Sequence, residues 1–417
     1  MKKKTLVVNG QQLNLRQCGG AGRYSRQLYN SLIDSKNAKK MAGIDIFFEG
    51  FEEIASLNGP SSNFTNTPLD RIKHAIYRSC PPVAFDRMQQ LYQYVSRGRK
   101  APTPVSELTG INSERLWISE KKSVTLLHEI TNYTSIDEIG RLILSSNFLL
   151  IVTFLDIQDF FYPEYFTDRT LRLRRLYYSF YKDRADYFFA ISENTKHTMV
   201  ERLGIKPEKI KVTHLAADDM LILAPSEQIV NWIKFFGRYW IYPAKAWKHK
   251  NHDFLLKSIG KRKGELKRAG IKLLLTGGFS NDDNLRLSRL VCDNNLHGIV
   301  EILGFVSDEQ LQALIKGADY LVFPSLFEGF GMPILEAMTL GCPVLSSNAG
   351  SLPEVGGDAA IYFDPTREDE FVALIDSVLR GSGIDRDLII QKGYENSKRF
   401  SWEKTYRETV EVYKELL

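Results

Sequence analysis

Two glutamates eight positions apart, Glu328 and Glu336, have the spacing that is most informative for chemistry. Gly-Phe-Gly follows the first, and a helical segment opens at Pro333, where a proline suits the first turn because its missing N–H would be unpaired there. A Gly-x-Gly loop before a helix presents N–H groups and the positive end of the helix dipole to a phosphate. From the glycines alone a tight turn is the simpler interpretation, but the two carboxylates favour a ligand site at a strand end.

The basic segment YPAKAWKHKN, residues 242–251, is a second candidate. It holds Lys245, Lys248 and Lys250 and follows an apolar run typical of a strand. One interpretation is a solvated loop, since runs of like charge are usually exposed. The functional interpretation is that two of these lysines neutralise a diphosphate as point charges.

The third candidate is the glycine segment QCGGAGRY, residues 17–24, which stands between an apolar run and a helical segment. Its glycines allow a ligand to approach the backbone closely. They do not form the dinucleotide fingerprint Gly-x-Gly-x-x-Gly, because the third glycine would fall at Ser25. A nicotinamide-dependent dehydrogenase is therefore disfavoured.

Short apolar runs alternate with helical-period segments along the whole chain, the pattern of parallel sheets covered by helices. The expected strands are 6–8, 43–48, 123–127, 148–154, 187–191, 240–242, 272–275, 300–303, 320–323, 344–346 and 360–363. We predict an α/β protein with doubly wound domains at 1–218 and 219–400 and a closing amphipathic helix at 401–417. Residues 60–122 lack this alternation of apolar runs and helical segments, which indicates an irregular insertion.

The composition is that of an ordinary globular protein, with 43% hydrophobic and 25% charged residues among 417. The longest apolar stretch, 148–155, is far shorter than the ~20 residues that span a bilayer. The apolar run behind the N-terminal lysines is too short for a signal peptide. Four scattered cysteines predict free thiols, and we expect a cytoplasmic protein. Residues 1–218 carry 31 Lys and Arg against 23 Asp and Glu, which suggests an anionic partner.

The motifs occur together, and in this order, in a known family. EGFGMPILEAM at 328–338, with GFV at 304–306, GCPV at 341–344 and LPEVGGDAA at 352–360, resembles the donor-binding half of the retaining glycosyltransferases of family 4. The segment 242–252 resembles the strand and loop that open this half, and GGAGRY at 19–24 resembles the family's N-terminal glycine loop. The C-terminal half matches densely and the N-terminal half only in patches.

The resemblance implies a GT-B fold, in which two Rossmann-like domains face each other and the last helix crosses back to the first domain. A nucleotide sugar would bind between the domains. Glu328 would contact the hydroxyls of the donor sugar, and Glu336 would hold the ribose. The other donor-binding positions that the resemblance implies are the amides of Gly329, Phe330, Gly331 and Met332, the lysines Lys245 and Lys250 on the diphosphate, the backbone around Val306 at the nucleobase, and Gly20 on the diphosphate from the opposite domain.

Two departures from the family pattern bear on catalysis. Lys245 stands where the family commonly has arginine, so the bidentate fork is lost while the charge is kept. Leu155-Asp156 stands where many members have His-Asp, and leucine cannot accept a proton. Asp156 and His128 are therefore catalytic candidates beside Glu328, although a lone histidine after a strand is more often structural.

No carboxylate is an obvious nucleophile, since Glu328 is interpreted as a hydroxyl ligand. We therefore expect what the resemblance implies, a front-face substitution with retention in which the leaving phosphate takes the proton of the acceptor. In this reaction the protein must orient the reactants and stabilise the charge that develops on the diphosphate. Lysines and backbone amides supply both without a cofactor, and we predict no metal site, because Asp218-Asp219 and Asp282-Asp283 lack the Asp-x-Asp spacing.

Residues 70–100 and 166–184 are basic and aromatic, which suggests peripheral contact with an anionic membrane on its inner face and a polyprenyl-diphosphate-linked acceptor. The alternative is a solvated face over an ordinary core stripe. No nucleic-acid-reading module is recognisable, so nucleic acid is not an expected partner. We predict a retaining, metal-independent hexosyltransferase of bacterial surface polysaccharide synthesis that uses a UDP- or GDP-sugar. The alternatives are a nucleotide-sugar epimerase and a non-catalytic nucleotide-sugar-binding GT-B protein.

Overall fold

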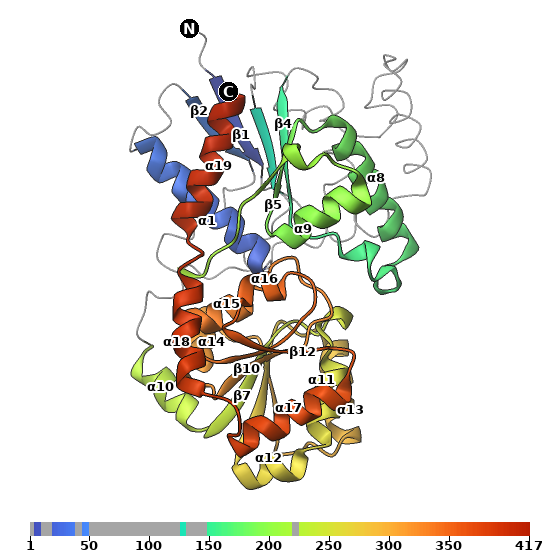
Figure 1. Cartoon of the computed structure of the whole chain (residues 1–417), viewed down its shortest axis with the longest axis vertical. Coiled ribbons are helices and arrows are strands. Elements are labelled where there is room, and N and C mark those ends of the chain that lie inside the picture. Colours follow the sequence, from blue (N-terminus) through green and yellow to red (C-terminus); the bar gives the residue numbers. More distant parts are fainter. Residues whose placement is uncertain (1–3, 10–18, 38–43, 50–125, 131–147, 219–224) are drawn as a thin grey trace, which may run out of the picture.

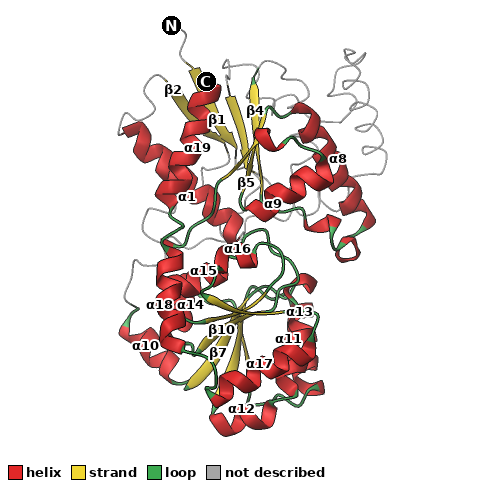
Figure 2. Cartoon of the chain, viewed as in Figure 1, coloured by secondary structure: helices red, strands yellow, loops and turns green. Residues whose placement is uncertain are grey.

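A computed structural model describes residues 4–9, 19–37, 44–49, 126–130, 148–218 and 225–417 of the chain. The expected insertion at 60–122 and the basic stretch at 70–100 lie outside the described residues. Figure 2 shows two sheets, each flanked by helices. Among the described helices, none is long and apolar enough to cross a membrane.

The N-terminal sheet has six parallel strands in the order β2-β1-β3-β4-β5-β6. Its strands are β1 (Lys4–Asn9), β2 (Ile44–Glu49), β3 (Leu126–Ile130), β4 (Leu149–Phe154), β5 (Tyr187–Ala190) and β6 (Ile210–Val212). The strands expected at 6–8, 43–48, 148–154 and 187–191 are confirmed with small shifts at their ends, whereas the one expected at 123–127 overlaps β3 only at 126–127, and β6 is an addition. The helices described in this half are α1 (Gly19–Asn37), α8 (Asp168–Arg184) and α9 (Glu193–Thr198), with short turns η2 (Gln158–Phe160), η3 (Pro163–Tyr165), η4 (Met199–Leu203) and η5 (Pro207–Lys209).

The C-terminal sheet also has six parallel strands, in the order β12-β11-β10-β7-β8-β9. The strands are β7 (Arg238–Pro243), β8 (Ile271–Thr276), β9 (Val300–Gly304), β10 (Tyr320–Phe323), β11 (Val344–Ser347) and β12 (Ala360–Phe363). All of β10 and β11 is buried, as expected for parallel strands covered on both faces. The helices here are α10 (Glu227–Lys234), α11 (His252–Gly260), α12 (Lys263–Ala269), α13 (Asn281–Asp293), α14 (Asp308–Gly317), α15 (Met332–Thr339), α16 (Leu352–Gly356), α17 (Glu368–Arg380) and α18 (Arg386–Ser397), with the short turn η7 (Lys248–Lys250).

The last helix, α19 (Trp402–Leu416), leaves the C-terminal domain and lies beside α1 on the N-terminal domain (Figure 1). The Ser401 side chain caps its first turn by accepting the N–H of Lys404. Trp402 packs near Tyr24 of α1, with ring centroids 6.4 Å apart, and Tyr413 is fully buried. The predicted helix that crosses back to the first domain is therefore confirmed.

The aromatic residues of 166–184 belong to the core rather than to an exposed surface. In α8 the rings of Tyr177, Tyr178 and Tyr181 are buried. Arg174 is 8% exposed and pairs with the buried Asp159, whose Oδ1 lies 3.0 Å from its Nη1. For the aromatic residues the alternative of a core stripe is confirmed, and the reason is the large apolar area that these rings remove from water when they pack in the core.

Candidate active site

The loop between β10 and α15 brings together two groups that were predicted from distant parts of the sequence. The Nζ atom of Lys250 lies 2.5 Å from Oε1 of Glu328. Their side chains are 14% and 12% exposed, so this is a largely desolvated pair rather than a surface ion pair. The predicted lysine segment and the predicted carboxylate loop therefore meet at the carboxyl ends of neighbouring strands, β7 and β10.

The two glycines of the loop are required for different reasons. Gly331 has φ of 106° and caps the start of α15, a backbone conformation that L side chains rarely adopt. Gly329 makes a close approach to the other domain: a Cβ atom there would lie 2.1 Å from the carbonyl oxygen of Leu155 and 3.1 Å from Cβ of Asp156. Because Leu155 and Asp156 directly follow β4, the two sheets face each other with their carboxyl ends.

Glu336 is 5% exposed in α15, and its carboxylate pairs with the guanidinium of Arg23 in α1. This contact joins the two domains beside the predicted glycine segment, since Arg23 lies one helical turn after Gly20 in the first part of α1. Sequence reasoning missed Arg23. The i, i+3 spacing from Gly20 was the signal that could have found it, because residues three apart share a helix face.

The remaining predicted donor residues lie around the same strand ends. Lys245 is half-buried in the turn after β7, with its Nζ 5.0 Å from the centre of the Trp247 ring. Val306 is half-buried after β9, next to Ser307, which caps α14. Phe330 and Met332 are buried, at 3% and 7% exposure.

Comparisons with known proteins agree with this geometry. The family described as "Glycosyl transferases group 1" matches residues 237–396. The chain is 32% identical over 268 residues to "O-antigen chain mannosyltransferase B" of Escherichia coli, a match that covers 63% of this chain and 70% of that protein. The chain belongs to the group 1 glycosyltransferases. It is also 27% identical to "MMP alpha-(1->4)-mannosyltransferase" of Mycolicibacterium hassiacum, over 54% of this chain and about half (53%) of that protein.

Solved structures show the fold of this glycosyltransferase. Anabaena Alr3699/HepE in complex with UDP and glucose superposes with a TM-score of 0.68 at 17% identity and covers 99% of both chains. Sucrose-phosphate synthase from Thermosynechococcus elongatus gives a TM-score of 0.66, also at 17% identity and 99% coverage of both chains. The predicted GT-B arrangement of two facing Rossmann-like domains is therefore confirmed.

His128 is enclosed in the core of the N-terminal domain, which corrects its selection as a catalytic candidate. Its side chain is fully buried, with Nδ1 2.5 Å from the Tyr413 hydroxyl and Nε2 2.7 Å from the Thr153 hydroxyl. Burial lowers the pKa of His128 to about 3, so the ring is neutral and a weak base near neutral pH. Asp156, the other candidate, lies against Gly329 in the loop between β10 and α15, whereas His128 lies inside β3.

Proposed function

We propose that this glycosyltransferase moves a mannosyl group from a nucleoside-diphosphate sugar to a growing glycan in surface-polysaccharide synthesis. The observation that carries the proposal is the Lys250–Glu328 pair, because it places a cation for a diphosphate beside a carboxylate for sugar hydroxyls in one loop. Mannose is favoured because several relatives are described as mannosyltransferases, two of them of the O-antigen chain.

Each group around the loop has a role in this proposal. Glu328 orients the donor through its sugar hydroxyls, and Lys245 and Lys250 balance the charge of the diphosphate. Glu336 accepts hydrogen bonds from the ribose hydroxyls, and Arg23 holds that carboxylate in place from the opposite domain. The amides of residues 329–332 lie at the start of α15, where the N–H groups of a helix are free to bind an anion.

The chemistry that this arrangement supports is a front-face substitution with retention. The bond between the anomeric carbon and the leaving phosphate breaks as the acceptor oxygen attacks from the same side, and the phosphate oxygen takes the acceptor's proton. The protein contributes by orienting the reactants and stabilising the charge that develops on the diphosphate. In this scheme Asp156, whose Cβ atom lies beside Gly329, orients the acceptor hydroxyl, and no metal has a part.

The acceptor is proposed to be a polyprenyl-diphosphate-linked glycan at the inner face of the membrane. With the aromatic residues of α8 in the core, a membrane contact at this helix would rest on exposed basic side chains such as Arg169 and Arg172. Flotation with anionic liposomes at physiological salt tests this contact. Absence of binding there would leave a soluble glycan as the acceptor.

A donor panel tests the proposed function. UDP- and GDP-sugars, including GDP-mannose, are incubated with the chain and with extracts of lipid-linked glycans, and the linkage of the product is determined by NMR. We expect transfer of mannose with retained anomeric configuration, a large loss of turnover in Glu328→Gln, and weaker donor binding in Glu336→Gln. An isomerised sugar formed without acceptor would instead indicate an epimerase, and nucleotide binding without hydrolysis or transfer would indicate a non-catalytic protein.

A further inference from the structure

The loop 328–331, which we call the donor loop, accepts hydrogen bonds from hydroxyl groups of both domains. The carbonyl oxygen of Gly329 accepts a hydrogen bond from Ser192 Oγ at 2.7 Å and one from Thr195 Oγ1 at 3.3 Å, both from the N-terminal domain. The carbonyl oxygen of Glu328 accepts one from Ser351 Oγ at 2.9 Å, within the C-terminal domain. The position of the loop therefore depends on where the β5–α9 turn sits relative to the C-terminal domain.

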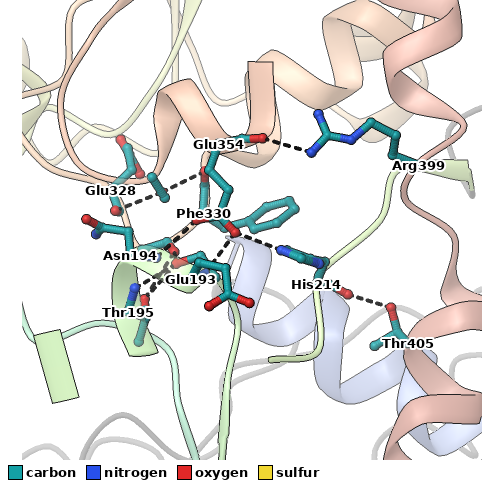
Figure 3. Close-up of polar contacts among 12 residues, drawn as sticks. Glu193, Asn194, Thr195, His214, Glu328, Phe330, Glu354, Arg399 and Thr405 are labelled. Carbon is teal, nitrogen blue, oxygen red and sulfur yellow. Dashed lines mark hydrogen bonds and ion pairs between the residues drawn. The ribbon is translucent and has the colours of Figure 1, made fainter. Parts of the chain in front are cut away.

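The Glu354 side chain links the C-terminal domain directly to this turn. Glu354 in α16 reaches across to α9, where its Oε1 accepts the N–H of Glu193 at 2.8 Å and its Oε2 accepts the N–H of Asn194 at 3.1 Å. Oε1 also lies 2.7 Å from Nε2 of His214, which follows β6 (Figure 3). A single carboxylate from the C-terminal domain thus receives three hydrogen bonds from the N-terminal domain.

The electrostatics of this contact favour the ionised carboxylate. Burial acts to raise the pKa of Glu354, but the hydrogen bonds from His214 and from the N–H groups of Glu193 and Asn194 outweigh it, and the pKa lies below its usual value. A carboxylate can only accept hydrogen bonds, so the Nε2 atom of His214 is the donor. His214 is itself held in place, because its carbonyl oxygen accepts the hydroxyl of Thr405 in α19.

We propose that Glu354 is a positioning residue of the transfer reaction. By joining α16 to the start of α9, it holds Ser192 and Thr195 within hydrogen-bond distance of the Gly329 carbonyl oxygen. The loop 328–331 is thereby kept in the conformation that the transfer reaction needs. The proposal rests on the proposed function only in taking this loop as the donor-binding loop. Its structural part, that Glu354 immobilises the loop from the other domain, stands independently.

The test compares the full-length wild type with Glu354→Gln. The amide side chain keeps the size of Glu354 but has a single acceptor oxygen and no charge, so it cannot satisfy three donors. His214→Leu, which removes the donor from the other domain, is the second variant. The control is Asp376→Asn, because Asp376 pairs with Arg262 at 2.5 and 2.8 Å entirely within the C-terminal domain.

The first readout is amide hydrogen exchange without any ligand. Glu354→Gln and His214→Leu should each speed exchange about tenfold in peptides that cover 193–195 and 328–332, while the core strand β8 stays protected. Asp376→Asn should leave both peptides as in the wild type. Unchanged exchange at 328–332 in both interdomain variants would overturn the proposal.

The second readout is turnover of GDP-mannose and UDP-glucose, the probes chosen from the donor panel. We expect kcat to fall about tenfold or more in Glu354→Gln with a smaller change in KM, because misplacement of a loop affects the transition state more than ground-state binding. A rise in KM alone would overturn the positioning role. If the wild type turns over neither probe, the proposed function fails, while the exchange experiment still decides whether Glu354 fixes the loop.

Discussion

Gly329 packs directly against the backbone of the facing domain. Its constraint is steric rather than conformational, since a Cβ atom would lie 2.1 Å from a backbone oxygen of the facing domain, and backbone cannot rotate away as a side chain does. A larger residue at 329 would therefore force the two domains apart.

We predict that Gly329→Ala lowers kcat/KM about 100-fold while the thermal unfolding midpoint changes little, because the clash pushes two folded domains apart. Gly278→Ala is the matched control, since a Cβ atom there meets nothing within 4 Å. Steady-state kinetics and a thermal melt of both variants give the comparison. Equal activities in the two variants would show that the domains do not close on this loop during turnover.

The Arg23–Glu336 pair gives a second prediction at the residue scale. Both side chains are largely buried, at 13% and 6% exposure, so removing one partner leaves a buried charge uncompensated. We expect Arg23→Met and Glu336→Gln each to cost about 2–3 kcal/mol in the free energy of unfolding, and the double variant to cost about 1 kcal/mol or more less than their sum. Urea titrations of the wild type, the two single variants and the double variant measure these free energies of unfolding. Strict additivity would mean that the two residues do not interact in the folded chain.

At the scale of elements, α19 is the segment that ties the C-terminus of the chain to the N-terminal domain. Its fully buried Tyr413 packs edge-on against His128, with ring centroids 5.7 Å apart, and lies 2.5 Å from the Nδ1 atom of that ring. Helix α19 buries an aromatic ring in the N-terminal domain and gives a buried histidine its hydrogen-bond partner. It is therefore a structural part of that domain, although it comes last in the sequence.

We predict that Tyr413→Ala costs about 3–5 kcal/mol in the free energy of unfolding, because it leaves a cavity and an unsatisfied His128 nitrogen. Tyr413→Phe keeps the ring and should cost about 1–2 kcal/mol, the contribution of the hydrogen bond alone. Chemical denaturation of both variants separates the two effects. A cost below about 1 kcal/mol for Tyr413→Ala would indicate that α19 does not dock on the N-terminal domain in solution.

The elements of the C-terminal domain could be predicted because its strands are continuous apolar runs that end in glycine and proline signals. β10 followed by Pro324 and Gly331 is an example, although the sequence did not predict the Lys250–Glu328 contact itself. By contrast, β6 has three residues, Ile210–Val212, too few for any period to stand out. For the aromatic residues of α8 the membrane surface and the core stripe both stayed open, because sequence alone does not show which side of a helix meets the sheet.

Contacts between the domains were the part of the site that sequence reasoning could not provide. Arg23 and Glu354 carry no local signal for pairing, since their partners lie 313 and more than 100 residues away in the chain. His128 shows the same limit in the other direction. We expected it just after a strand, but it lies inside β3, and only the path of α19 reveals that a tyrosine covers it.

At the scale of the whole molecule, buried neutral histidines couple stability to pH. Burial lowers the pKa of His128 to about 3, against 6.5 for the exposed group. As pH falls below 6.5 the unfolded chain takes up this proton while the folded chain does not, so the contribution of His128 to stability is complete above 6.5 and is lost as pH falls toward 3. Burial also lowers the pKa values of His249 and His252 to about 3. These two residues therefore also make the C-terminal domain less stable as pH falls below 6.5.

We predict that His128→Gln weakens the pH dependence of the free energy of unfolding by up to about 1.4 kcal/mol per pH unit between pH 6 and pH 4. Urea midpoints measured at several pH values give the slopes. His197→Gln is the control, because its side chain is 71% exposed and pairs only with Glu201 in the adjacent turn. Parallel slopes for the wild type and His128→Gln would contradict the buried neutral state.

We propose above all that a nucleoside diphosphate binds at the carboxyl ends of the C-terminal sheet, where the ammonium group of Lys250 balances part of its charge. Thermal unfolding with GDP, UDP, GDP-mannose and UDP-glucose measures this directly in the wild type, in Lys250→Met, and in Lys261→Met, which removes an exposed lysine that pairs with Glu368. We expect at least one of these nucleotides, at about 100 times its Kd, to stabilise the wild type and Lys261→Met by roughly 2.7 kcal/mol and Lys250→Met far less at the same concentration. No stabilisation of the wild type by any of the four, or an equal response in Lys250→Met, would contradict it.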